Sequence, residues 1–271
     1  MLGSIELVLF AAAFGCFIFA WLLHFVGWQQ RSAPKTRTAI GVLWLGWVLL
    51  FAMVGLRWYR AEHVPMLSAF EFVTFFALLV VGCFLLFARN ERNQMLGVFL
   101  VPVGLLLMGY AAFMPKDIEP ELIIFDGLLL QFHILTTLLG YAAWSVTFAA
   151  SICFLYLERK QESEPGMFDT MAYRAAFFAF SFLTLGILTG ALWSDQVFGK
   201  LWFWDPKETW SFITWLIFLA YLHARYTLDW RGRRAAILAI VGFASLVFTY
   251  VGVDFLLPQI HGAASDAGMG Q

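Results

Sequence analysis

Repeated apolar runs of about 20 residues constrain the fold of this chain more than any other feature. The sequence contains eight such runs, at residues 4–28, 39–58, 67–88, 94–114, 127–157, 171–193, 206–226 and 235–256. An α-helix rises about 1.5 Å per residue, so each run can cross a hydrocarbon core of about 30 Å. Backbone polar groups must be hydrogen-bonded inside lipid, and a helix satisfies them within one segment. We therefore predict an all-α polytopic membrane helix bundle, with one transmembrane helix for each of these runs.

The composition supports a membrane protein and excludes several other classes. Apolar residues make up 62% of the 271 residues and charged residues only 13%, too few to cover the surface of a soluble domain. No basic stripe is available for binding nucleic acid. The first apolar run is too long for a signal-peptide core and lacks a basic leader, so we expect a retained helix. Without internal repeats or low-complexity linkers, the sequence predicts a single domain over residues 1–271.

The three cysteines, Cys16, Cys83 and Cys153, are isolated from one another and lie inside apolar runs. No C-x-x-C pair is present, so the sequence suggests neither thiol–disulfide chemistry nor a thiolate metal site. We expect these side chains to act as small buried hydrophobes.

Lysine and arginine are distributed unevenly between the connections. Twelve of them follow the first, third, fifth and seventh runs: Arg31, Lys35, Arg37, Arg89, Arg92, Arg159, Lys160, Arg174, Arg225, Arg231, Arg233 and Arg234. The other five are Arg57, Arg60, Lys116, Lys200 and Lys207. Cytoplasmic connections are the richer in basic residues. We therefore expect a multi-pass protein of the cytoplasmic (inner) membrane, with both termini and residues 193–210 outside the cytoplasm.

Residues 193–210 form a short polar and aromatic segment between two apolar runs, with four tryptophans in 18 residues. Asp205 suits the N-cap of the following helix, Pro206 its first turn, and Glu208 a capping box. Helix initiation does not explain the tryptophans of this segment, which either anchor helices at the membrane interface or form a flat aromatic surface for a ligand. The tryptophans in the apolar runs are instead predicted to form membrane-interface belts: Trp21, Trp28, Trp44, Trp47, Trp58 and Trp144.

The five histidines fall into two groups by predicted depth. His133 lies about 10 Å into the fifth run from its outer end, and His63 and His261 lie in or beyond outer connections. His24 and His223 lie near the inner face. Neutral imidazole ligates metals and is costly to bury in lipid without a role. Pairs of histidines among apolar aromatic residues favour haem iron over zinc, which prefers closed four-ligand sites.

The tryptophan-rich segment resembles the motif W-G-x-x-W-x-W-D-x-K-E-x-W of the cytochrome c assembly proteins, most closely those of the system II type, called CcsA or ResC. The matching residues are Gly199, Trp202, Trp204, Asp205, Lys207, Glu208 and Trp210, with Trp193 at the position of a preceding tryptophan. Phe198 replaces the first tryptophan of the motif and lacks an indole N–H. His133 and His261 lie in segments that resemble those carrying the two external histidines of the family. A stretch with Arg57, His63, Pro65 and Glu71 resembles G-H-x-P-x-x-N-x-Y-E, with Ser68 and Phe70 replacing Asn and Tyr.

The resemblance implies a function in cytochrome c biogenesis, in which haem b is presented outside the membrane for covalent attachment to apocytochrome c. His133 and His261 would be the axial ligands, and His223 would belong to a haem site within the membrane. We infer from its depth that His24 completes that second site. The segment from Trp193 to Trp210, with Gly199, Trp202, Trp204 and Asp205, would hold the porphyrin. The implied partners are a CcsB- or ResB-type membrane protein, the C-x-x-C-H segment of the apocytochrome, haem and the lipid membrane.

Several assignments stay open at the level of sequence. Arg57, Arg60, Lys200 and Lys207 could meet the haem propionates, or extend to the membrane interface as snorkelling side chains. A HemX-like regulator of haem synthesis shares the tryptophan motif and is one alternative function. A bis-histidine transmembrane cytochrome that passes electrons to a quinone is another. We expect the chain to be the haem-presenting subunit of a complex that forms the thioether bonds.

Overall fold

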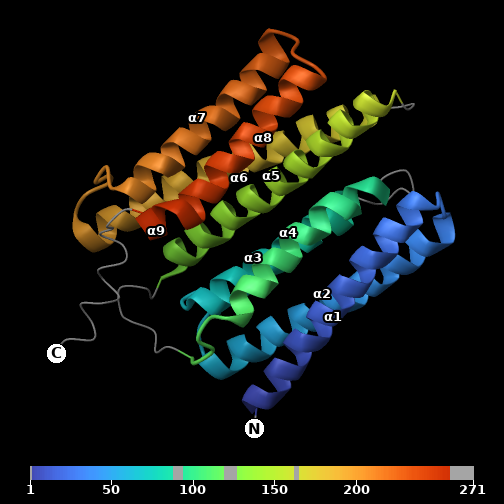
Figure 1. The fold of residues 1–271 in the computed structure, drawn as a ribbon. Coiled ribbons are helices and arrows are strands. Elements are labelled where there is room, and N and C mark those ends of the chain that lie inside the picture. Colours follow the sequence, from blue (N-terminus) through green and yellow to red (C-terminus); the bar gives the residue numbers. More distant parts are fainter. Residues whose placement is uncertain (1, 88–93, 119–126, 162–164, 257–271) are drawn as a thin grey trace. The chain divides into compact units, whose positions relative to one another are not determined.

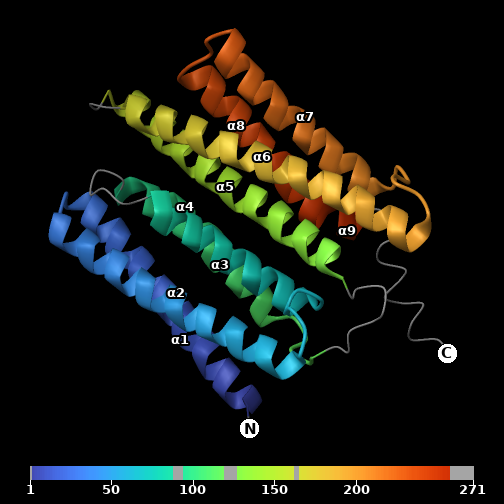
Figure 2. The ribbon, with the colours of Figure 1, turned by 180° about the vertical axis from the view of Figure 1, so that it is seen from behind.

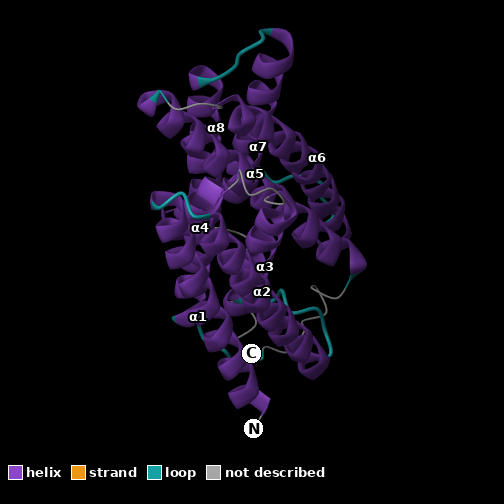
Figure 3. Ribbon diagram, turned by 90° about the vertical axis from the view of Figure 1, so that its right-hand side faces the viewer, coloured by secondary structure: helices purple, strands orange, loops and turns teal. Residues whose placement is uncertain are grey.

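The structure is a computed structural model that describes residues 2–87, 94–118, 127–161 and 165–256. Every regular element among these residues is a helix, as Figure 3 shows. The predicted all-α fold is therefore confirmed for the described part of the chain. The helices group into two compact units, Met1–Ile134 and Leu135–Gln271, which we describe separately. The assignment of residues 1–271 to one haem-handling domain stays a prediction.

The first unit is built on four long helices that run side by side (Figures 1 and 2). They are α1 (Leu2–Gln29), α2 (Ala33–Ala61), α3 (Ala69–Phe87) and α4 (Gln94–Ala112). One face of α1 is buried at helical spacing, through Ala13, Phe17 and Ala20. Indole N–H groups join neighbouring helices, since Trp21 donates to the Val98 carbonyl at 3.1 Å and Trp47 to the Leu78 carbonyl at 2.9 Å. The interior therefore combines apolar packing with specific polar contacts.

The second unit contains most of α5 (Leu128–Lys160) and all of the later helices. These are α6 (Pro165–Phe198), α7 (Pro206–Thr227), α8 (Arg233–Val247), a π-helical turn (Phe248–Gly252) and α9 (Val253–Leu256). An ion pair between Arg225 and Asp169, with N–O distances of 2.7 and 2.8 Å, joins the end of α7 to the start of α6. Trp215 on α7 donates to the Thr184 hydroxyl on α6 at 2.8 Å. These contacts fix α7 against α6 along their length.

The predicted transmembrane runs correspond closely to the helices of the structure. Seven of the described helices are long and apolar enough to cross a membrane. The predicted run at 206–226 also forms a helix, α7, whose 22 residues span about 33 Å. It is not among the seven because His223, Arg225 and several hydroxyl and tryptophan side chains lower its hydropathy.

Trp144 does not belong to a membrane-interface belt, so its predicted role is wrong. Its side chain is fully buried, and its Nε1 donates to the Ala239 carbonyl on α8 at 3.1 Å. Its ring stacks on Phe218 with centroids 3.4 Å apart. A tryptophan in the middle of an apolar run therefore serves here as a core residue that joins α5, α7 and α8. Trp44 and Trp58 are about half exposed, as expected of belt residues.

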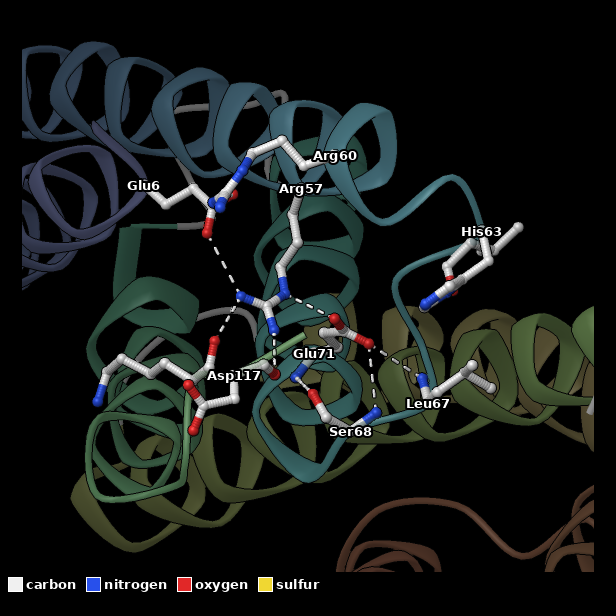
Figure 4. Close-up of polar contacts among 10 residues, drawn as sticks. Glu6, Arg57, Arg60, His63, Leu67, Ser68, Glu71 and Asp117 are labelled. Carbon is white, nitrogen blue, oxygen red and sulfur yellow. Dashed lines mark hydrogen bonds and ion pairs between the residues drawn. The ribbon is translucent and has the colours of Figure 1, made fainter. Parts of the chain in front are cut away.

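A buried cluster of charges, the Arg57 cluster (Glu6, Arg57, Arg60 and Glu71), lies at one end of the first unit (Figure 4). Arg57 is only 2% exposed, and its Nε donates to Glu71 at 2.6 Å. A second guanidinium nitrogen donates to Glu6 at 3.3 Å, and Glu6 also accepts from Arg60 at 2.6 Å. Charged groups are tolerated at such low exposure when they are paired and hydrogen-bonded.

Arg57 also holds the chain that follows α4. Its guanidinium donates to the carbonyl oxygens of Lys116 at 2.9 Å and Asp117 at 2.8 Å. The guanidinium therefore links α1, α2, α3 and the connection after α4. We expected Arg57 to be a snorkelling residue or a cation for propionates, and this prediction is wrong, because its donors are occupied inside the unit.

Glu71, which pairs with Arg57, is itself held by a capping box at the start of α3. The Ser68 hydroxyl accepts from the Glu71 amide at 3.2 Å, and the Glu71 carboxylate accepts from the amides of Leu67 and Ser68, each at 3.2 Å. The pattern S-x-x-E before an apolar run is a sequence signature of such a box, so this capping box was predictable from residues 68–71. His63, in the same connection, is buried and lies 3.1 Å from the Val64 carbonyl through Nδ1.

We predict that Arg57→Met destabilises the first unit by about 3–5 kcal/mol, because it leaves the buried Glu71 carboxylate without its cation. Arg60→Met is the matched control and should cost at most about 1 kcal/mol, since Arg60 is partly exposed and Glu6 keeps Arg57. Unfolding of the purified protein in detergent, followed against denaturant, measures both changes. Equal losses in the two variants would contradict the role given to Arg57.

Candidate functional site

The connection between α6 and α7, residues 199–205, is the irregular segment on which the motif residues gather, and we call it the tryptophan loop. It begins at Gly199, whose φ of 69° lies in the left-handed region that glycine adopts at low cost. The Gly199 amide donates to the Asp195 carbonyl at 2.9 Å and ends α6 as a glycine C-cap. The Ser194 hydroxyl donates to the Lys200 carbonyl at 2.8 Å and holds the next residue of the loop. Gly199 therefore sets the direction in which the loop leaves α6.

The end of the tryptophan loop is fixed by the first turn of α7. Asp205 is buried and its Oδ1 accepts from the Glu208 amide at 2.7 Å, so the predicted N-cap is confirmed. Glu208 reaches back and accepts from the Phe203 amide at 2.7 Å. These charge-assisted hydrogen bonds hold the backbone on both sides of Trp204. The two acidic residues of the motif thus position the loop.

Trp204 lies between these two hydrogen bonds in an unusual conformation. Its φ is 59°, which is costly for a bulky residue, by about 1–3 kcal/mol. Its carbonyl lies 3.3 Å from the Thr209 hydroxyl, which donates to it. The ring is 67% exposed, although a large aromatic side chain gains most from burial. The local structure therefore maintains an exposed indole at a conformational cost, which is typical of a binding residue.

A continuous row of aromatic rings leads from Trp204 along α7. Trp202 contacts Trp204 edge-on, with centroids 5.9 Å apart, and both contact Phe212 at 6.5 and 6.4 Å. Phe212 stacks on Trp215 at 5.8 Å, and Trp215 stacks on Phe180 at 5.3 Å. Phe212, Trp215 and Phe180 were not predicted from the sequence as part of the site. Their spacing along α7 and α6 brings them together only in the folded unit.

The Trp202 side chain has an indole N–H that is buried without an acceptor. Among the described residues, none accepts a hydrogen bond from its Nε1. A buried donor without a partner costs about 1–3 kcal/mol, so an acceptor supplied by a ligand would stabilise this side chain. An orphaned donor next to an exposed ring fits a ligand that has both a flat apolar surface and polar groups.

Trp210, the last residue of the motif, packs inside the second unit. Its ring lies 4.3 Å from that of Phe248 in the π-helical turn, and its carbonyl accepts from the Thr249 hydroxyl at 3.2 Å. Thr249 also lies 2.9 Å from the Thr214 hydroxyl, which lies 2.7 Å from that of Ser245. This buried hydroxyl cluster, absent from our predictions, ties the π-helical turn to α7. The described chain then ends at Leu256, shortly before the position of His261.

The remaining motif residues contribute to the packing of the loop. Trp193 contacts Phe198 edge-on at 5.7 Å, and Phe198 contacts Phe203 in the same way at 5.9 Å. The Lys200 ammonium lies 5.1 Å from the centroid of the Phe203 ring. Lys200 is therefore engaged in a cation–π contact beside the loop.

The structure places the predicted histidines in different environments. His133 is half-buried on α5, in the second turn of the helix, and belongs to the first unit. His223 is exposed on α7, in the second unit, with Nδ1 3.4 Å from the Thr227 hydroxyl. His261 lies outside the described residues. The joint ligation of one iron by His133 and His261 therefore stays a prediction.

His24 is fully buried in the first unit, between α3 and α4. Its ring meets Phe84 edge-on at 5.6 Å, and a Cβ added to Gly97 would lie only 2.9 Å from the ring. Neither ring nitrogen is hydrogen-bonded within the described chain. Imidazole nitrogens without hydrogen bonds fit a role as ligands of a metal. His223, the predicted second ligand, belongs to the other unit. Their pairing at an intramembrane haem also stays a prediction.

Comparison with known proteins decides the family. The family model for the cytochrome C assembly protein matches residues 66–261, which include the tryptophan loop, His133 and His223. This chain belongs to the cytochrome c assembly protein family. The resemblance predicted from the sequence is thereby confirmed, together with a function in cytochrome c biogenesis.

Relatives extend the similarity over nearly the whole chain. The cytochrome c biogenesis protein CcsA of Chlamydomonas reinhardtii is 34% identical over 245 residues, which cover 85% of this chain and 69% of the relative. The CcsA protein of Gloeobacter violaceus is 29% identical and is matched over 96% of both chains. Similarity at this level includes α1 and α2, which lie before the region matched by the family model.

A solved structure, the cytochrome c haem lyase CcmF, shares the fold. The TM-score is 0.74 at 19% sequence identity, and the match covers 99% of this chain. This chain spans about half the length of that lyase, since 49% of it is covered. The likeness confirms the helical membrane architecture of this cytochrome c assembly protein.

We predict that Asp205→Ala releases the first turn of α7, because the cap of the Glu208 amide is lost. A lost N-cap costs about 1 kcal/mol, which corresponds to roughly fivefold faster hydrogen exchange at that amide. Asp205→Asn keeps a side-chain acceptor and should exchange almost as slowly as the wild type. Amide hydrogen exchange of residues 203–209, measured by mass spectrometry, tests this prediction. Unchanged exchange in Asp205→Ala would show that the cap does not hold the loop.

Proposed function

We propose that this chain binds haem b at the tryptophan loop and presents it on the extracytoplasmic side of the membrane to apocytochrome c. The observation that carries the proposal is the state of Trp204, an exposed ring held in a strained conformation by hydrogen bonds on both sides. A porphyrin is a flat apolar ring with polar edges. The row of aromatic rings from Trp204 to Trp215 offers a surface of matching character.

The polar groups of the site support the same ligand. The unpartnered Trp202 indole N–H is a donor for a propionate or another acceptor on the ligand. The proposal adds two imidazoles predicted from the sequence, those of His133 and His261. Imidazole nitrogens are common axial ligands of haem iron. Bis-imidazole ligation would hold the haem in one orientation, with a vinyl-bearing edge left accessible.

The protein then contributes mainly by positioning. Haem, when bound, supplies the vinyl groups that the cysteine thiols of the apocytochrome attack. The tryptophan loop would orient the ring and exclude water from its faces, and the imidazoles would fix its rotation. Holding reacting groups in this way supplies a large part of a rate enhancement. We find no described cluster of three or more His, Cys, Asp or Glu residues that would hold a separate metal ion.

The partners and membrane orientation are part of the proposal. The distribution of Lys and Arg supports an orientation with the tryptophan loop outside the cytoplasm, where apocytochromes c are found. The thioethers form at a C-x-x-C-H segment, so the partner must bring that segment to the loop. We propose a CcsB- or ResB-type membrane protein for this task, and the cytoplasmic (inner) membrane as the location.

We predict that His133→Ala and Trp204→Ala reduce covalent cytochromes c in cells that depend on this chain. His133→Ala removes a proposed axial ligand and should reduce haem c staining to the background. Trp204→Ala removes one ring contact, worth about 1.5 kcal/mol, and should reduce the staining about tenfold. The matched control is Trp58→Ala, since Trp58 is also an exposed tryptophan and lies in the first unit. Cytochromes b should be normal in all three strains.

Spectra of the purified protein separate this proposal from its alternatives. Haem b that is lost with His133→Ala or His261→Ala supports presentation. Tight stoichiometric haem that is lost only with His24→Ala or His223→Ala would instead indicate an electron-transfer cytochrome. Normal haem c staining in a strain lacking the gene would exclude the assembly function and favour a HemX-like regulator.

A further inference from the structure

A charged groove lies at the end of the second unit opposite to the tryptophan loop, where α5 ends and α8 begins. Its cavity of about 490 Å³ is lined by Leu155, Glu158, Arg159, Arg233 and Ile237, and we call it the arginine groove. A neighbouring cavity of about 530 Å³ shares Glu158 and Arg233 with it and includes the start of α8. Neither cavity contains a residue of the proposed haem site.

The lining residues repeat one arrangement on both helices. On α5, Leu155 precedes Arg159 by four residues, and on α8, Arg233 precedes Ile237 by four. Residues four apart lie on the same face of a helix, about one turn or 6 Å from each other. Because α5 ends here and α8 begins here, each aliphatic residue lies deeper in an apolar span than its arginine. The groove therefore has a cationic rim and an apolar floor.

Large aromatic side chains pack between α5 and α8. Trp144 contacts α8 at Ala239, and Phe148 stacks on Phe243 with centroids 4.0 Å apart. Nearer the groove, a Cβ added to Gly232 would lie 3.1 Å from the Phe154 ring. These rings fill the space between α5 and α8 farther into the unit, and the cavity lies beyond them, at the end of α5.

The charges of the groove favour an anion. Arg159 and Arg233 are both exposed, and neither forms an ion pair with a residue that the structure describes. Glu158 contributes one opposing carboxylate, which leaves the rim with a net positive charge. In the neighbouring cavity, Arg231 is paired with Asp229 at 2.8 Å, whereas Arg234 adds a further positive charge.

We propose that the arginine groove binds the headgroup of an anionic phospholipid. The phosphodiester would lie between the guanidinium groups of Arg159 and Arg233, which suit phosphate oxygens in bidentate geometry. The glycerol and the first acyl carbons would lie on Leu155 and Ile237. Both helices are candidate membrane spans, so the groove lies at the level where headgroups meet acyl chains. A soluble anion would contact the rim but would not use the apolar floor.

Native mass spectrometry of the purified full chain in detergent tests this with phosphatidylglycerol as the probe and phosphatidylcholine as the neutral reference. The double variant Arg159→Gln/Arg233→Gln should bind phosphatidylglycerol about 25-fold more weakly, since each arginine contributes on the order of a fivefold gain. Arg174→Gln is the matched control, because it removes an exposed arginine of α6 that lines neither cavity. It should bind as tightly as the wild type.

A second variant separates a lipid from a free anion. Ile237→Trp fills the apolar floor and keeps both arginines, so it should weaken phosphatidylglycerol binding severalfold. Inorganic phosphate at millimolar concentration should not displace the lipid from the wild type. Equal binding of both lipids, unchanged binding in the double variant, or displacement by inorganic phosphate would overturn the proposal.

Discussion

The requirement that backbone polar groups be hydrogen-bonded inside lipid controls this structure. It confines the regular parts of the described chain to helices and moves irregular backbone to their ends. A loop between two helices can offer a ligand both a flat apolar surface and free polar groups of the backbone and side chains. The tryptophan loop is such a place, since a glycine ends α6 and an aspartate begins α7 on either side of it. The proposed haem site therefore lies where the helical backbone is interrupted.

Charged side chains in the protein have two distinct roles. In the Arg57 cluster they are buried and satisfied, and they join three helices and a connection at one end of the first unit. Removing Arg57 leaves the buried Glu71 carboxylate without its cation, so the stability of this end of the unit depends on that one residue. In the arginine groove the charges are exposed and unbalanced, which leaves them available to a ligand. The two groups of charged residues differ in their burial and in their ion-pair partners, and the residue types alone do not show this difference.

Much of the fold could be predicted from the sequence because hydrophobic length is a local property. Each predicted run corresponds to a helix, and Asp205 was identified as an N-cap from its position before Pro206. Contacts between distant residues could not be predicted in the same way. Trp144 has the same surroundings in the sequence as a belt tryptophan, yet the carbonyl of Ala239 and the ring of Phe218 bury it. Arg57 similarly needed Glu6, which lies 51 residues away in the sequence.

The sequence motif identifies the residues of the proposed site but not the structural role that each of them has in the loop. The motif identified Trp204 and Asp205 together, and the structure assigns them different tasks, exposure for the ring and capping for the carboxylate. The strained φ of Trp204 and the orphaned indole N–H of Trp202 have no sequence signature, because they arise from the loop geometry. The most direct test of the central claim is an experimental structure of the haem-loaded protein. We predict that the porphyrin lies in van der Waals contact with Trp204 and that His133 ligates the iron. Haem bound away from both residues would contradict the account.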